Sequence, residues 1–224
     1  PSRPPPAPVV GYPAPPARRP ALGPRAGPGA AAPPWRLAFV GRAEGRKGFA
    51  EALDALARLR AAGRPVELHG VGLDAAEAAM HLAALAPETR AGVVLHGRLD
   101  DAAMARVLAS AHLVLAPSRY ESYGYVYREA GAFARPLVAS AEDPSARAYL
   151  GETGAGLLAA ATEGAAIAEA VARLLDAPAL AARLGARGRA HVEGLDPGAL
   201  ARRTLAIYET AVGRGRAVVK DRGA

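Results

Sequence analysis

The 224-residue sequence has no cysteine, only 5% aromatic residues and no long apolar run. Without cysteine, neither a disulfide framework nor a thiolate metal site can form. A bilayer-spanning helix needs roughly 18 to 20 consecutive apolar residues, and the sequence contains no such run. The proline-rich N-terminus also lacks the apolar segment of a signal peptide. We therefore expect a cytoplasmic protein without a transmembrane segment.

Acidic residues are scarce at both ends of the chain. The sequence has 28 basic and 21 acidic residues, and its net charge of +7 comes from residues 1–34 and 213–224. The segment between them carries 20 residues of each sign. A nucleic-acid-binding domain gathers basic residues on the folded face that meets phosphate. We therefore expect no nucleic-acid partner.

The two ends also differ from the middle in composition. Residues 1–34 consist mainly of Pro, Ala, Gly and Arg, and such a segment cannot bury enough apolar surface to offset its ordering entropy. We interpret residues 1–34 as a disordered linker, residues 35–212 as one folded domain and residues 213–224 as a basic tail.

In the middle segment, short β-type runs alternate with helix-type runs. This alternation predicts an α/β fold with a doubly wound, mostly parallel, Rossmann-like sheet, flanking helices and further helices at the C-terminus. Strands are expected at residues 36–40, 65–69, 92–96, 112–116, 136–139 and 156–159. Helices are expected at residues 49–60, 100–109, 125–133, 163–175, 179–191 and 197–212.

The glycine-rich run GRAEGRKG, residues 41–48, follows the first expected strand. It is not a Walker P-loop, because Arg46 precedes and Gly48 follows the lysine where Gly and Ser or Thr are required. The loop instead brings Arg42 and Lys47 to the carboxyl edge of the sheet. Such cations suit a diphosphate group. The residues are equally compatible with two cations that pair with Glu44 on a solvated loop.

A second run, PSRYESYGYVYREA at residues 117–130, follows the fourth expected strand. It places Glu121 in a loop and Glu129 in the first turns of a helix, where carboxylates can accept hydrogen bonds from sugar hydroxyls. Gly124 allows the backbone to approach a ligand, and the helix N-terminus adds positive potential. By itself the eight-residue spacing is more simply explained by two solvated glutamates.

Other candidate groups carry little signal. Ser118 lacks the Gly-x-Ser-x-Gly context of a hydrolase nucleophile. The tyrosines at 120, 123, 125 and 127 fit packing better than nucleobase stacking. None of the five histidines has the spacing of a metal ligand, so no metal site is predicted: His69, His81, His96, His112 and His191.

Residues 117–130 resemble the Glu-x7-Glu motif of retaining glycosyltransferases of the GT-B fold, in the family 4 type. Residues 37–42 followed by Lys47 and Gly48 are similar to that family's Val-Gly-Arg-x4-Lys-Gly segment. The resemblance covers about residues 35–212. It implies the C-terminal, donor-binding half of such an enzyme, with an acceptor-binding N-terminal domain missing from the chain.

The resemblance implies a role for each matching residue. Arg42 and Lys47 would contact the diphosphate, Glu121 the donor sugar and Glu129 the ribose, and the first three would be catalytic. The backbone around Tyr123, Gly124 and Tyr125 would hold sugar and phosphate, and residues 97–99 would border the nucleobase. The donor-binding set is Gly41, Arg42, Lys47, Gly97, Arg98, Leu99, Glu121, Ser122, Tyr123, Gly124, Tyr125 and Glu129.

The implied reaction transfers a hexose from a UDP- or GDP-sugar to an unidentified glycan, lipid or small-molecule acceptor, with retention and without a metal or other cofactor. A lipid acceptor would place the protein peripherally at the inner membrane face. This half alone is expected to be inactive. The alternatives are a non-catalytic nucleotide-sugar-binding or interaction domain and a GT-B sugar-nucleotide epimerase.

The sequence departs from the family at two places. Ala134 stands where the family commonly has Gly, and a left-handed conformation there would cost about 1 kcal/mol. Residues 142–147 replace a Gly-Gly-x-x-Glu segment, and this change leaves donor specificity near that loop undecided.

Overall fold

The computed structural model describes residues 33–221. The expected linker therefore lies outside the described residues except for Pro33 and Pro34, as do the last three residues of the basic tail. The described chain divides into two units, one that ends at Glu193 and one that begins at Gly194.

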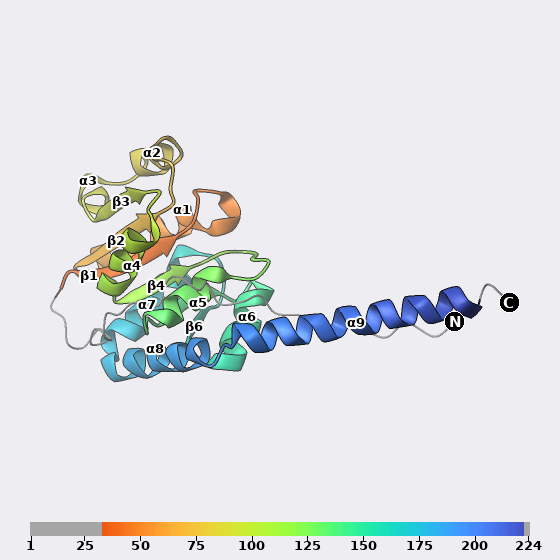
Figure 1. The fold of residues 1–224 in the computed structure, drawn as a ribbon. Coiled ribbons are helices and arrows are strands. Elements are labelled where there is room, and N and C mark those ends of the chain that lie inside the picture. Colours follow the sequence, from red (N-terminus) through yellow and green to blue (C-terminus); the bar gives the residue numbers. More distant parts are fainter. Residues whose placement is uncertain (1–32, 222–224) are drawn as a thin grey trace. The chain divides into compact units, whose positions relative to one another are not determined.

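The larger unit is built on a six-stranded, all-parallel sheet with the order β3-β2-β1-β4-β5-β6 (Figure 1). This arrangement confirms the predicted fold class. The order runs in opposite directions from the centre, so β1 and β4 flank the switch point where open α/β sheets bind ligands. The strands are β1 (Trp35–Val40), β2 (Val66–Val71), β3 (Val93–Gly97), β4 (Leu113–Ala116), β5 (Leu137–Ser140) and β6 (Gly156–Ala159).

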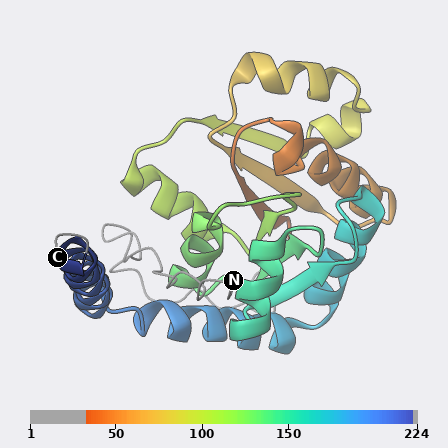
Figure 2. The same cartoon turned by 90° about the vertical axis from the view of Figure 1, so that its right-hand side faces the viewer.

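Helices cover both faces of the sheet (Figures 1 and 2). α1 (Phe49–Ala61) and α7 (Gly164–Asp176) pack on one face. α4 (Asp101–Ser110), α5 (Tyr125–Ala132) and α6 (Pro144–Thr153) pack on the other. The remaining elements of this unit are η2 (Gly45–Lys47), α2 (Ala75–Ala83), α3 (Pro87–Arg90) and α8 (Pro178–Glu193).

Alternation along the strands builds the two cores. Leu37 and Phe39 of β1 belong to the core under α1 and α7, whereas Ala38 between them belongs to the core under α4, α5 and α6. Both faces are buried, so the strands are almost continuously apolar, as parallel strands usually are. Each fully buried Leu or Phe contributes about 1.5–3 kcal/mol. The carboxyl ends of the strands are thereby held in a fixed row.

The sequence predictions missed four helical elements, namely η2, α2, α3 and α6. α6 has a clear signal, since Asp143 caps it and Pro144 occupies its first turn. The segment that we described only as a departure from the family is therefore a helix start. In the second unit, α9 (Pro197–Asp221) continues past the expected end at residue 212 into the segment that we named the basic tail.

Ala134 follows the end of α5 with a φ of 53°. This is the left-handed region, in which a β-carbon is crowded. Ala134, which stands where the family commonly has Gly, therefore adopts the conformation that favours glycine. The cost relative to glycine is about 1 kcal/mol.

Candidate functional site

The loops after β1 and β4 meet at the switch point. The backbone N–H of Arg119 donates to the carbonyl of Arg46 at 2.8 Å, which joins the two loops directly. Gly48 permits this approach: it has a φ of 73°, and a β-carbon there would lie 2.3 Å from the carbonyl oxygen of Pro117. Both requirements exclude any other residue without a shift of the backbone.

This close approach brings Lys47 to Glu121 across 74 residues of sequence. The Lys47 ammonium lies 2.5 Å from Oε1 of Glu121, with side chains only 18% and 10% exposed. The Ser118 hydroxyl donates to the same oxygen at 2.7 Å. Ion pairs that are this well shielded are screened less by salt than surface pairs. Because Lys47 pairs with Glu121, the alternative in which it pairs with Glu44 is wrong.

Arg42, in contrast, lies in the solvated ion pair with Glu44 that the sequence also allowed. Its guanidinium pairs with Glu44, and its side chain is 61% exposed. Arg46 pairs with the same carboxylate at 2.9 Å. The structure thus brings Lys47 and Glu121 together and leaves Arg42 in a solvated ion pair at the rim.

The turn that opens α5 is held by aromatic and cationic contacts. Gly124 has a φ of 70°, and a β-carbon there would lie 2.2 Å from the ring of Tyr127. The Arg128 guanidinium stacks 3.8 Å from the Tyr123 ring centroid and donates to the Tyr123 carbonyl at 3.1 Å. Tyr123 and Tyr125 meet edge to face at 5.1 Å. Ser122, which follows Glu121 in the sequence, and Tyr125 are both exposed.

The remaining predicted residues lie along the same edge or behind it. The N–H of Gly41 donates to the Val71 carbonyl at 2.9 Å, and the N–H of Gly72 donates to the Gly97 carbonyl at 2.7 Å. These bonds tie the ends of β1, β2 and β3 together. Arg98 is exposed, and Leu99 packs on the core under α4.

Glu129 lies on α5 and is only 7% exposed. Its predicted partner is a ribose. The sequence interpretation of two solvated glutamates is wrong, since both Glu121 and Glu129 are buried.

Comparison with known proteins decides the family. The family model for glycosyl transferases group 1 matches residues 25–191. The chain belongs to this family. It is 34% identical over 186 residues to the phosphatidyl-myo-inositol mannosyltransferase of Mycobacterium leprae, a match that covers 80% of this chain and 48% of the relative. The chain therefore spans about half of that relative's length.

Solved glycosyltransferases of the GT-B fold share its architecture. The sucrose-phosphate synthase of Thermosynechococcus elongatus superposes with a TM-score of 0.69 at 28% identity, over 80% of this chain and 46% of that one. Anabaena HepE in complex with UDP-glucose superposes with a TM-score of 0.66 at 20% identity, over 80% and 49% of the two chains. At that identity the second likeness concerns the fold alone.

One group of residues at this candidate site was not predicted from the sequence. Asp143 is fully buried, and its Oδ1 accepts from the N–H groups of Glu121 at 3.2 Å and Ser145 at 3.0 Å. Its Oδ2 accepts from the Tyr127 hydroxyl. Burial, followed by the hydrogen bond to Asp143, raises the pKa of Tyr127 far above its usual range. The Asp-Pro pair was the available sequence signal, but it indicated only a helix cap.

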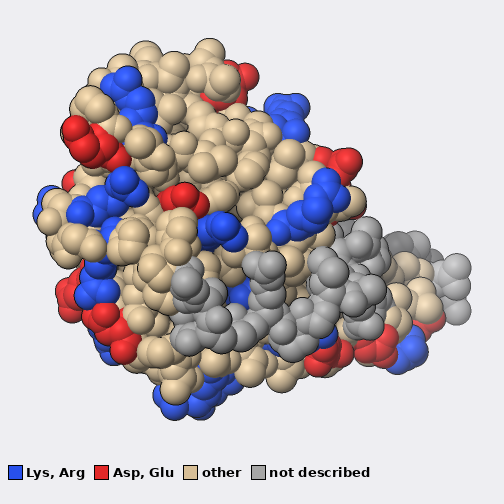
Figure 3. Space-filling model, turned by 90° about the vertical axis from the view of Figure 1, so that its left-hand side faces the viewer, with Lys and Arg blue, Asp and Glu red and all other residues tan. Residues whose placement is uncertain are grey.

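On the face drawn in Figure 3, Lys and Arg side chains are interspersed with Asp and Glu side chains. Among the side chains that the structure describes, no three of His, Asp or Glu are grouped so as to hold a metal ion. His69 and His96 contact each other at 3.0 Å, and burial first, then His69, lowers the pKa of His96. No helix in the described part is long and apolar enough to cross a membrane.

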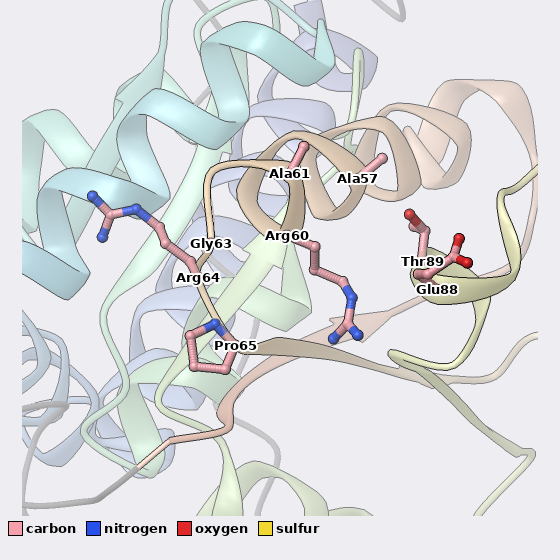
Figure 4. A pocket seen from close by; sticks show the side chains of 8 residues that line it. All are labelled: Ala57, Arg60, Ala61, Gly63, Arg64, Pro65, Glu88 and Thr89. Atoms are coloured by element: carbon pink, nitrogen blue, oxygen red, sulfur yellow. The ribbon is translucent and has the colours of Figure 1, made fainter.

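A separate pocket of about 460 Å³ lies at the amino end of β2, away from the loops described above. In Figure 4, Arg60 extends from α1 between the turn of residues 63–65 and α3, which carries Glu88 and Thr89. Arg64 makes a two-pronged ion pair with Asp176 at 2.6 and 2.8 Å. None of the predicted site residues lines this pocket.

Proposed function

We propose that this chain is the donor-binding half of a retaining glycosyltransferase of the family 4 type. The complete enzyme would transfer a hexose from a UDP- or GDP-sugar to an acceptor. The observation that carries the proposal is the convergence of Lys47, Glu121 and the N-terminus of α5 at the switch point of a group 1 glycosyltransferase fold.

The cations suit the leaving group. When the bond between the anomeric carbon and the diphosphate oxygen breaks, negative charge develops on the diphosphate, and fixed cations stabilise it. Lys47 is held in place by Glu121 and carries three donor hydrogens, so it can contact a phosphate without leaving this partner. Arg42 is exposed at the rim and would supply a two-pronged contact.

The N-terminus of α5 supplies the second positive element. The first amides of a helix lack partners within the helix, and their dipoles favour an anion. Gly124 forms the N-cap of α5 in the left-handed conformation, with no side chain capping the helix. The amides near Tyr123, Gly124 and Tyr125 would hold sugar and phosphate oxygens, while Gly97, Arg98 and Leu99 would border the base.

The reaction would proceed by front-face displacement. The acceptor oxygen would form the new bond on the face from which the diphosphate leaves, and the acceptor proton would pass to a diphosphate oxygen. Lys47, Arg42 and the helix would stabilise the charge, so we propose that no metal ion is needed. Glu121 would orient the sugar through its hydroxyl groups.

The test is calorimetry of the 224-residue chain with UDP, GDP, uridine, guanosine, UDP-glucose and GDP-mannose. The relatives' names motivate the choice of mannose and glucose donors. We expect either UDP or GDP to bind far more tightly than the matching nucleoside. The double variant Arg42→Ala, Lys47→Ala should lose most of this difference in affinity. Equal binding of nucleoside and diphosphate would contradict the proposed role of the cations.

A matched control is the double variant Arg58→Ala, Arg189→Ala. It removes one exposed cation, Arg58, and one half-buried cation, Arg189, each of which pairs with a carboxylate within its own helix. Its nucleotide binding should equal that of the wild type. A chain that binds nucleotide sugar, but whose full-length form transfers none, would support a non-catalytic domain instead.

A further inference from the structure

Neighbouring segments hold Glu121 by hydrogen bonds to its backbone as well as to its side chain. Its N–H donates to Asp143 at 3.2 Å, and its carbonyl accepts from the Ser145 hydroxyl at 2.6 Å. Its carboxylate is held separately by Lys47 and Ser118. Segments after three neighbouring strands, β1, β4 and β5, therefore converge on this one residue.

Asp143 is the centre of the backbone attachment. It is fully buried, and the donors that the structure gives its carboxylate are two backbone N–H groups and the Tyr127 phenol. A buried carboxylate is expensive unless several donors satisfy it, so these bonds confine Asp143 to one position. Its place at the N-terminus of α6 adds a favourable helix dipole.

Tyr127 ties this carboxylate to the opening turn of α5. Its ring is 1% exposed and lies where a β-carbon on Gly124 would be, so the turn rests on the ring. Its carbonyl accepts from the Tyr149 hydroxyl at 3.1 Å. The hydroxyl of Tyr127 therefore connects the turn at Gly124 with the residue that holds the Glu121 backbone.

We infer that Asp143, together with Ser145, is a positioning residue for the donor sugar: it fixes the backbone of Glu121 so that the carboxylate meets the sugar in one orientation. The segment 142–147 then acts through side-chain hydrogen bonds to Glu121. This inference rests on the proposed function. It predicts that loss of Asp143 weakens the contribution of the sugar to binding more than that of the nucleotide.

The measured quantity is the donor ratio, defined as the Kd of the nucleoside diphosphate divided by the Kd of its nucleotide sugar. The probes are UDP with UDP-glucose and GDP with GDP-mannose, titrated calorimetrically into the 224-residue chain. We expect Asp143→Ala to lower the donor ratio about tenfold, the equivalent of one well-placed hydrogen bond. Asp143→Asn should keep the ratio within about twofold, because its amide oxygen still accepts from both N–H groups.

Two further variants separate positioning from stability. Asp74→Ala removes the N-cap of α2, which accepts from Ala76 at 2.8 Å, and so reproduces a loss of capping away from Glu121. Its donor ratio should equal that of the wild type. Ser145→Ala removes the bond to the Glu121 carbonyl at a half-buried position and should lower the ratio about threefold. Ser145→Ala decides the question if Asp143→Ala does not fold.

The outcomes distinguish the inference from the function beneath it. A wild-type chain that binds neither nucleotide sugar would overturn the proposed function and this inference with it. If the wild type binds a nucleotide sugar while Asp143→Ala and Ser145→Ala keep its donor ratio, only the inference falls. An equal loss in Asp74→Ala would also overturn it, because the effect would then reflect stability.

Discussion

The ion pair between Lys47 and Glu121 should couple the stability of the two loops. We expect Lys47→Met to lower the free energy of unfolding by about 2–4 kcal/mol, since it leaves the Glu121 side chain, which is only 10% exposed, without its cation. Glu121→Gln should cost less, because the amide oxygen still accepts from Ser118. In the double variant neither charge is stranded, so the two losses should not add.

The measurement is a double-mutant cycle from urea unfolding followed by circular dichroism. We expect a coupling energy of about 1.5–3 kcal/mol for this pair. The matched control is Asp54 with Arg58 on α1, whose side chains are 49% and 53% exposed at 3.0 Å. That pair should couple by no more than about 0.5 kcal/mol and should weaken further in salt.

Equal coupling in the two cycles would refute the reasoning. It would mean that the Lys47 ammonium contributes no more than a surface charge, so the position of Glu121 would depend on its backbone contacts alone. Salt sensitivity of the Lys47 pair as large as that of the control would point the same way.

Three other predictions concern separate features. Glu129→Ala should weaken nucleoside diphosphate binding by about 1.5–3 kcal/mol, while Glu121→Ala should weaken mainly the sugar's contribution; equal effects in calorimetry would contradict these roles. Ala134→Gly should raise the free energy of unfolding in urea by about 0.5–1 kcal/mol, because relief of the left-handed strain exceeds the added entropy of the unfolded chain. Ala79→Gly, on an exposed turn of α2, should lower it by about 1 kcal/mol instead. The isolated chain should bind a nucleotide sugar but transfer almost no sugar to acceptors and release almost no nucleoside diphosphate, since a GT-B site is completed by its other half; efficient transfer would contradict this.

The sequence contains most of the information on the sheet, because alternation and apolar runs are local. Each of the six strands was predicted within two residues of its observed bounds at either end. The helices that escaped prediction are short or capped by a single residue. α3 has four residues, and a single Asp-Pro pair at its N-terminus is the start signal of α6.

The site was predictable as a set of loops but not as a set of contacts. Lys47 pairs with Glu121 and not with Glu44 because the loops after β1 and β4 approach each other closely. This approach depends on the left-handed Gly48 and on its fit against Pro117. The bond from Glu121 to Asp143 likewise depends on the adjacency of β4 and β5 in the sheet. Nothing in the local pattern specifies either contact.

The two cations of the first loop differ in how they are held, and this difference bears on ligand entry. The exposed pair of Arg42 with Glu44 is worth at most about 1 kcal/mol, so Arg42 can exchange its partner for a phosphate at little cost. Lys47 is confined by a buried carboxylate and gains a second anion only by sharing its hydrogens. A ligand would therefore find one cation already in position and attract the other, so most of the ordering at this edge precedes binding and lowers its entropic cost.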